Sequence, residues 1–442
     1  MRLNYLLLRN FRNYVDCEIE FPNKGNLIIG GNAQGKTSLL EAIYFLSTAK
    51  SHRTYPDDEL IRHNEDWFYL KGMIAGESDS TTPTQPTGTH SNLIHEFPLA
   101  NSAVQSSYIE GCQPSADISN CYSTSSKPGR QDLDSPNMTL EVSNESNGKK
   151  RFKLNGDLQR KLSEWIGQFN VVFFSPESLT LVKGAPSERR RFIDILISQL
   201  SPAYLNHLQN YQFALKQRNE LLKQIRAKQA GSDDLEPWDM LLIADGIAII
   251  QSRNEMLSRL RTYAQMKHIE LTGGSETLDL EYLPPQALEG ISSISQSEAE
   301  DIYLKALTYS RSHDILRGTT SVGPHRDDLK LMLETGRDEN FQRQDAKAFC
   351  SQGQQRTIAL ALKLGELELI HTLTNKAPIV LLDDVISELD EMRSKYLFDL
   401  LQRLNSQTFI TSTRLKVWTE SLEDSCILTI KNGQVIRQNA QN

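Results

Sequence analysis

Apolar residues along the chain follow two spacings, which predict strands and helices in one fold. Residues 3–9 and 171–174 are apolar-rich runs of strand length, and residues 27–29 form a shorter apolar run. From residue 36 to 47, apolar residues recur at helical spacing, which predicts a helix soon after the short run. Buried strands that alternate with amphipathic helices are typical of an α/β fold.

A β-hairpin and an unusual insertion follow. Residues 139–142 and 151–154 flank the turn-forming pair Asn147-Gly148, which predicts the hairpin. Before it, residues 76–137 are rich in Ser, Thr, Asn, Gln and Pro. Such a segment buries too little apolar surface to offset its ordering entropy. It is therefore interpreted as a low-complexity insertion without stable order.

Residues 201–270 have a different pattern, with apolar residues at spacings of three, four and seven. This pattern predicts two helices that form a short antiparallel arm, and the spacing in the first helix breaks at Arg218. The predicted domains are a head made of residues 1–75, 138–200 and 311–442, and a helical arm over residues 201–310.

Composition and charge narrow the class of protein. The 442 residues are 38% hydrophobic and 24% charged, which is typical of a soluble globular protein. The chain lacks the ~18 consecutive apolar residues of a membrane span and begins without a signal peptide. We therefore expect a cytoplasmic protein with no membrane partner. Because the net charge is −8, any contact with nucleic acid has to come from a local basic patch.

The segment between the apolar run 27–29 and the helix at residue 36 has the pattern of a phosphate-binding P-loop. Glycines let backbone N–H groups converge on phosphate oxygens, and the N-terminus of the following helix favours negative charge. Lys36 is expected to reach the β- and γ-phosphates of ATP, and Thr37 to coordinate Mg²⁺. The predicted nucleotide-binding residues here are Gly30, Gly31, Asn32, Ala33, Gln34, Gly35, Lys36, Thr37 and Ser38.

Far downstream, the apolar run 379–382 ends in two carboxylates. An acid at the end of a buried strand holds the magnesium shell in P-loop ATPases, so Asp383 is the second predicted Mg²⁺ residue. Asp384 stands where related ATPases carry a glutamate that polarises the attacking water. Because aspartate is shorter, it predicts slow hydrolysis, which suits a switch. The predicted catalytic residues are Asp384, Lys36 and Ser351.

Residues 351–355, with the sequence SQGQQ, are similar to the signature of ABC-type ATPases. A hydroxyl and a backbone N–H at a helix start can meet a γ-phosphate held by another copy. Ser351, Gly353 and Gln355 are thus predicted to complete the ATP site across an ATP-dependent homodimer. Alone, the pentapeptide is equally well explained as a helix N-cap. Its position after the P-loop and before the acid pair favours an ABC-type head, and residues 387–390 fit the D-loop of such heads.

Two charged segments fall outside these motifs. Residues 323–329 carry charges beside a Gly-Pro turn, and residues 184–192 place arginines 189–191 at a helix start. Three cations are unfavourable in the field of a helix N-terminus, so acids or phosphates are expected to neutralise them. A DNA contact, a contact at the ATP interface and a solvated, salt-bridged face all remain open.

These segments, together with residues 8–14, span nearly the whole chain in an order that resembles the bacterial RecF family. The sequence Gly-Pro-His-Arg-Asp-Asp-Leu at 323–329 is a specific part of that resemblance. It implies a head related to those of Rad50 and SMC proteins, which binds ATP and Mg²⁺ and dimerises on ATP. It also implies slow, DNA-stimulated hydrolysis, binding to single-stranded and duplex DNA at gap junctions, and RecO and RecR as partners in loading RecA.

The chain departs from the family pattern in three places. Residues 76–137 occupy what is usually a short connection. Where related heads use a Q-loop glutamine, the chain has only Ser175-Pro176-Glu177, and no switch histidine is evident. Residues 411–413 follow the strand where that histidine is expected, so the sequence leaves the γ-phosphate sensor unassigned.

Two other functions have to be weighed. An SMC-like tether would hold DNA through a long coiled coil, and the short arm predicted here argues against it. The ATPase subunit of a transporter shares the same motif order, but the helical arm and the missing switch histidine disfavour it.

Overall fold

The computed structural model describes residues 1–442 except 23, 55, 77–136, 337–341, 414–424 and 439–442. The insertion predicted over residues 76–137 lies outside the described residues apart from its two ends, so it remains a prediction. The chain divides into two units, of which the described one comprises Met1–Gly76 and Asn137–Asn442.

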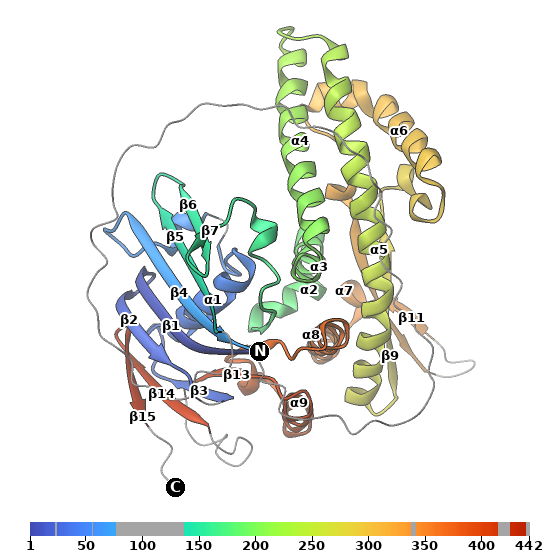
Figure 1. The fold of residues 1–442 in the computed structure, drawn as a ribbon. Helices are drawn as coiled ribbons and strands as arrows, with labels where there is room; N and C mark the ends of the chain where they lie inside the picture. Colours follow the sequence, from blue (N-terminus) through green and yellow to red (C-terminus); the bar gives the residue numbers. More distant parts are fainter. Residues whose placement is uncertain (23, 55, 77–136, 337–341, 414–424, 439–442) are drawn as a thin grey trace, which may run out of the picture. The chain divides into compact units, whose positions relative to one another are not determined.

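The strands of the described residues form three sheets (Figure 1). They are β1 (Arg2–Phe11), β2 (Tyr14–Glu20), β3 (Gly25–Ile29), β4 (Trp67–Ala75), β5 (Asn137–Glu145), β6 (Lys150–Leu154), β7 (Asp157–Leu158), β8 (Val171–Phe174), β9 (Glu276–Leu283), β10 (Asp328–Thr335), β11 (Gln342–Asp345), β12 (Ile379–Asp383), β13 (Thr408–Ser412), β14 (Cys426–Lys431) and β15 (Gln434–Gln438). The strands predicted around residues 3–9, 27–29 and 171–174 are confirmed as β1, β3 and β8, and the predicted hairpin is confirmed as β5 and β6.

Two of the sheets are antiparallel and one is mixed. The antiparallel sheets have the orders β2-β1-β4-β5-β6-β7 and β11-β10-β9. The mixed sheet has the order β15-β14-β3-β13-β12-β8, and its strands from β14 to β8 pair in parallel. This sheet brings the strand before the P-loop close to the strand that ends in the two carboxylates, with only β13 between them.

The helices of the described residues cover these sheets and build the arm. They are α1 (Lys36–Thr48), α2 (Thr180–Lys183), α3 (Pro186–Leu200), α4 (Pro202–Arg226), α5 (Glu236–Thr272), α6 (Gln296–Arg317), α7 (Ala346–Phe349), α8 (Gln352–Thr374) and α9 (Glu391–Arg403). Within the described ranges, no helix combines the length and the apolar character that crossing a bilayer requires.

Strand β12 shows why the mixed sheet is so apolar. Ile379 and Leu381 lie in one hydrophobic core with α1 and the larger antiparallel sheet, whereas Val380 and Leu382 lie in a second core with α3, α8 and α9. Successive side chains of a strand point to opposite faces, so a strand covered on both faces is apolar at every position. Asp383 is the first polar residue, and it lies at the carboxyl end of the strand.

The two predicted helices of the arm are confirmed as α4 and α5, which lie side by side in Figure 1. Helix α5 has 37 residues, so it spans about 55 Å. Its C-terminal half packs on α8 of the head, where a Cβ added to Gly365 would lie 2.8 Å from the Ala264 backbone nitrogen. Residue 310, the expected end of the arm, falls inside α6.

The apolar spacing of the first predicted helix breaks at Arg218, and α4 itself runs through this position without interruption. Arg218 is fully buried, and its guanidinium donates to Asp239 at 2.7 Å and to Asp314 at 2.9 Å. These two carboxylates belong to α5 and α6, so the interrupted apolar spacing marks a buried ion pair that joins three helices.

Candidate functional site

Two turns that are distant in sequence, at residues 12–13 and 432–433, contact the predicted P-loop. Gly35 precedes α1 at a φ of 116°, a left-handed conformation that favours glycine. The Tyr14 hydroxyl donates to the Gly35 carbonyl and the Asn13 amide to the Gln34 carbonyl, both at 2.9 Å. From the second turn, the Asn432 backbone N–H donates to the Gln34 side chain at 2.7 Å. The loop shape is therefore fixed by contacts that the local motif does not contain.

Lys36 lies beneath the loop with 9% of its surface exposed. Its ammonium donates to the carbonyls of Gly30 and Gly31, each at 2.9 Å. A Cβ on Gly30 would lie 2.6 Å from the Ile430 carbonyl oxygen, so this position has room only for glycine. The loop thus combines a sheltered cation with a glycine backbone, which is the arrangement that phosphate binding requires.

Asp383 and Thr37 lie together, although 346 positions separate them in the chain. The Thr37 hydroxyl donates to the Asp383 carboxylate at 3.1 Å, and Thr411 donates to the same oxygen at 2.7 Å. Burial raises the pKa of Asp383, and these two hydrogen bonds only partly oppose the shift. A hydroxyl and a carboxylate so placed offer the hard oxygen ligands that Mg²⁺ prefers.

Asp384 differs from its neighbour because its side chain is exposed. It precedes the short 3-10 helix Val385–Glu388 in a left-handed conformation with a φ of 52°. The Thr411 hydroxyl accepts its backbone N–H at 2.9 Å, and Ser387 donates to its carbonyl at 2.8 Å. One threonine on β13 therefore orients both acids. In the sequence, Thr411 is notable only because it follows the strand where a switch histidine was expected.

A pocket of about 450 Å³ opens over the loop. It is of a size typical for small-molecule sites. Arg12 and Arg53 also border it, and the sequence analysis assigned neither to the site. Arg12 pairs with the buried Glu41 of α1 through two contacts of 2.9 and 2.8 Å. The predicted residues that line this pocket are Ala33, Gly35, Lys36, Thr37 and Ser38.

The signature segment lies at the start of α8, and Ser351 is its N-cap. The Ser351 hydroxyl accepts the Gln354 backbone N–H at 3.2 Å, while the Gln354 side chain accepts the Ser351 backbone N–H at 2.8 Å. Ser351 and Gly353 are exposed, and neither borders the P-loop pocket of the described residues. Gln355 is buried and donates to the Ala346 carbonyl at 3.3 Å, so its side chain points into the protein.

The two charged segments meet in the fold, where an arginine of residues 184–192 pairs with an aspartate of residues 323–329. Arg189 makes a bidentate contact with Asp328 at 2.8 and 2.9 Å. The neighbouring Asp327, whose side chain is buried, pairs at 2.9 Å with Arg253 of α5. These residues form salt bridges, but not on the solvated face that was one of the open interpretations, because Arg189, Arg253 and Asp327 are buried. The pairs join α3, α5 and the turn at 323–329.

Known proteins with similar sequences and structures extend this description. Residues 1–225 match the family model for the AAA ATPase domain. A "DNA replication and repair protein RecF" from Natranaerobius thermophilus is 37% identical over 450 residues, which cover 100% of both chains. The chain belongs to the RecF family. A second RecF, from Bacillus cytotoxicus, is 37% identical over 98% of both chains.

Solved structures of the RecF family share the fold. One, described as the recombination mediator protein RecF-ATPrS in the RecFOR pathway, has a TM-score of 0.76 and 31% identity over 99% of this chain and 98% of that one. Another, described as RecF-ATP, has the same TM-score and identity. The predicted class, an α/β head of ABC type with a helical arm, is thereby confirmed.

Proposed function

We propose that this protein is an ATP-dependent DNA-binding protein of DNA replication and repair, in which ATP joins two copies around shared sites. The observation that carries the proposal is the 3.1 Å hydrogen bond between Asp383 and Thr37, which lines the P-loop pocket. Relatives named for DNA replication and repair, and related structures named with ATP, support the same assignment.

The residues of the pocket fit a nucleotide with Mg²⁺. The P-loop backbone and Lys36 bind the β- and γ-phosphates, and Lys36 exchanges its two loop carbonyls for phosphate oxygens. Thr37 and Asp383 would hold a magnesium ion, which would neutralise charge on the phosphates. Asp384, exposed at the edge of the site, positions the attacking water, and its short side chain makes hydrolysis slow.

The second copy supplies the Ser351 face. Ser351 and Gly353 are exposed at the N-terminus of α8, away from the lining of the P-loop pocket. Such a helix start offers N–H groups and a hydroxyl to a γ-phosphate held by a partner. Gln355 contributes by supporting α8 from inside, because its side chain is buried. ATP thereby acts as the bridge of a homodimer.

The finer steps follow from the RecF family. The dimer binds single-stranded and duplex DNA at gap junctions, and DNA stimulates the slow hydrolysis that releases it. RecO and RecR act with it to load RecA, which agrees with the RecFOR pathway in the description of the related structure. A long DNA tether is disfavoured, because the longest described helix spans only about 55 Å.

The test measures ATP hydrolysis as a function of protein concentration, with and without duplex DNA, in low and moderate salt. Per-molecule activity that rises with both protein and DNA is expected, because each site requires a second copy. If activity per molecule depends on neither protein concentration nor DNA, the nucleotide site remains supported, but the ATP-dependent dimer and the DNA-binding function are contradicted.

A further inference from the structure

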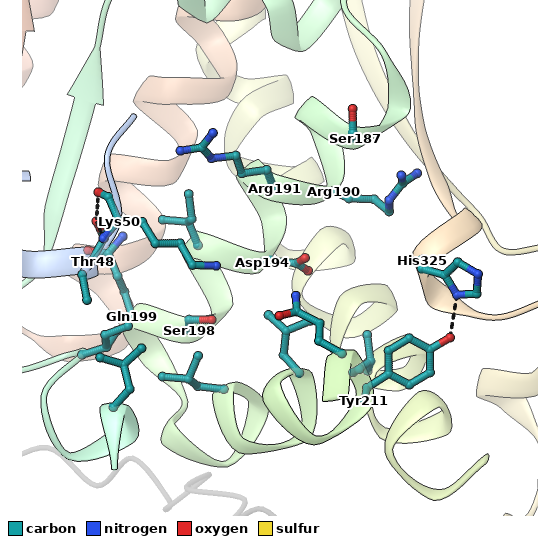
Figure 2. A pocket seen from close by; sticks show the side chains of 18 of the residues that line it. Thr48, Lys50, Ser187, Arg190, Arg191, Asp194, Ser198, Gln199, Tyr211 and His325 are labelled. Atoms are coloured by element: carbon teal, nitrogen blue, oxygen red, sulfur yellow. Dashed lines mark hydrogen bonds between the residues drawn. The ribbon is translucent and has the colours of Figure 1, made fainter. Parts of the chain in front are cut away.

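A second pocket, separate from the P-loop pocket, lies where the head meets the base of the arm (Figure 2). Its volume is about 470 Å³, and it shares no lining residue with the P-loop pocket. The segment after α1, the helices α3, α4 and α5, and the turn at 323–329 all contribute to its walls. The proposed ATP switch gives this pocket no role.

Positive charge dominates the polar part of the lining. Five cationic side chains, Lys50, Lys150, Arg190, Arg191 and Arg253, share the walls with two carboxylates, Asp57 and Asp194. Both carboxylates are already paired. Asp57 contacts Lys150, and Asp194 makes a bidentate contact with Arg253 at 2.9 and 3.0 Å.

Lys50 and Arg190 are therefore left without a carboxylate within ion-pair distance among the described residues. Figure 2 shows the Lys50 side chain extending into the pocket toward Asp194, and its ammonium makes no hydrogen bond to a described residue. Arg190 donates to a backbone carbonyl, that of Asp327. Lys50 is exposed and Arg190 is half-buried, so water solvates part of their charge, and a bound anion would balance the part that the pocket encloses.

The pKa values of the same groups show that cost. Partial desolvation lowers the pKa of Lys50, although the residue keeps an exposed surface; Asp194 raises this pKa and Arg191 lowers it. Burial lowers the pKa of Arg190 and the nearby Arg253 lowers it further, whereas the carboxylates of Asp327, Asp194 and Asp328 raise it. A bound anion would relieve this unfavourable environment for both cations.

The rest of the lining is apolar and suits the organic part of a ligand. Leu208 and Ile249 form buried walls from the two arm helices, and Phe152 faces the pocket from β6 of the head. A phosphate alone would leave these walls without a partner. A flat, weakly polar ring attached to a phosphate would contact both the apolar walls and the cations.

We propose that this junction pocket binds a nucleoside phosphate, with the phosphate at Lys50 and Arg190 and the nucleoside against the apolar walls. The ligand can be a free nucleotide or the phosphorylated terminal nucleotide of a DNA strand, since both present the same chemistry. Binding of a DNA end would depend on the proposed DNA-binding function, whereas binding of a free nucleotide would not.

The test compares ligands that differ only in the phosphate, using the full-length protein. Calorimetry measures binding of dAMP and of deoxyadenosine. Fluorescence anisotropy measures binding of one 3′-labelled single-stranded oligonucleotide with either a 5′-phosphate or a 5′-hydroxyl. The variants are Lys50→Gln and Arg190→Gln, and the control is Lys376→Gln, which removes an exposed lysine between α8 and β12. Lys50→Gln breaks no hydrogen bond to a described residue, so the folded protein is expected to remain intact.

The expected result is that dAMP binds, deoxyadenosine does not, and Lys50→Gln weakens dAMP binding about tenfold or more, the usual effect of losing a hydrogen bond between charged groups. Arg190→Gln acts in the same direction, and Lys376→Gln has no effect. If Lys50→Gln also removes an advantage of the 5′-phosphate, the ligand is a DNA end. If both oligonucleotides bind alike while dAMP still requires Lys50, the ligand is a free nucleotide.

The proposal is overturned if the phosphate confers no advantage in either assay, or if its advantage is unchanged in Lys50→Gln and Arg190→Gln. These outcomes are distinct from failure of the proposed function. Equal, Lys50-independent binding of both oligonucleotides, together with dAMP binding that is also independent of Lys50 and Arg190, would overturn the pocket and leave DNA binding in place. Absence of all oligonucleotide binding, with Lys50-dependent binding of dAMP, would overturn the proposed DNA binding and leave the pocket in place.

Discussion

Thr411→Val tests whether one buried hydroxyl organises the pair of acids at the nucleotide site. Thr411 lies directly beside Asp383 in the parallel pairing of β12 with β13. Its hydroxyl donates to the Asp383 carboxylate at 2.7 Å and accepts the Asp384 backbone N–H at 2.9 Å. Valine has nearly the same shape, so the substitution removes these two bonds with little change in packing.

The expected loss of stability follows from those two bonds. A hydrogen bond to a charged group contributes about 1.5–3 kcal/mol and a neutral one about 1 kcal/mol. Thr411→Val should therefore lower the free energy of unfolding by about 2–4 kcal/mol. Thr408→Val is the matched control on the same strand, because Thr408 is equally buried and donates to the Ser406 carbonyl at 3.3 Å. It should cost about 1 kcal/mol or less.

The pH dependence has a definite sign. Burial raises the pKa of Asp383 above its value in the unfolded chain. The protonated acid therefore contributes its full stabilisation of the fold at pH values below the unfolded pKa, and this contribution is lost as the pH rises through the folded pKa. Removing the Thr411 donor raises that pKa further. The difference in stability between wild type and Thr411→Val should therefore grow from acidic to mildly alkaline pH, whereas the Thr408→Val difference should stay constant.

The assay is equilibrium unfolding in urea without nucleotide, repeated across that pH range for the wild type and both variants. Equal losses for the two variants would refute the role given to Thr411. So would a loss in Thr411→Val that does not change with pH, because the charged acid would then not be its partner.

Three further predictions address the ATP site, the dimer and the joint between head and arm. Lys36→Ala should weaken ATP binding about tenfold or more by removing the phosphate cation; unchanged binding in calorimetry would contradict the P-loop assignment. Ser351→Arg should leave ATP binding intact and block ATP-driven dimerisation; a normal ATP-dependent dimer in light scattering would exclude a role across the interface. Arg253→Met should lower the free energy of unfolding by about 3–5 kcal/mol, since it leaves the buried Asp327 without its cation. Adding Asp327→Asn should restore part of that loss, and urea unfolding that shows no recovery would mean that the unpaired charge is not the cause.

Much of the fold could be predicted from the local sequence. The apolar run 379–382 predicted a buried strand because a strand covered on both faces has no polar position until it ends. The glycines around Lys36 predicted a loop whose backbone approaches other groups closely, and a Cβ at Gly35 would indeed lie 2.6 Å from Asn13. These features could be read in advance because neighbouring residues alone impose them.

The same reasoning failed where a polar residue found its partner far away. Arg218 interrupted an apolar spacing, and the sequence did not show that its partners Asp239 and Asp314 lie on two other helices. Gln355 looked like part of an exposed signature, yet its side chain is buried. Periodicity records only whether a residue is apolar, and it does not show that a charge is balanced by one from another element.

The sequence by itself determined the P-loop, the apolar strand before the two acids, the helical arm and the resemblance to the RecF family. The tertiary structure decided which residues meet, Thr37 with Asp383 and Thr411 with both acids, and it placed Lys50 and Arg190 on the walls of a second pocket. The physical reason is the range of the interactions. Backbone conformation and strand or helix periodicity depend on adjacent residues, whereas hydrogen bonds and charge balance depend on distances in space that only the folded chain sets.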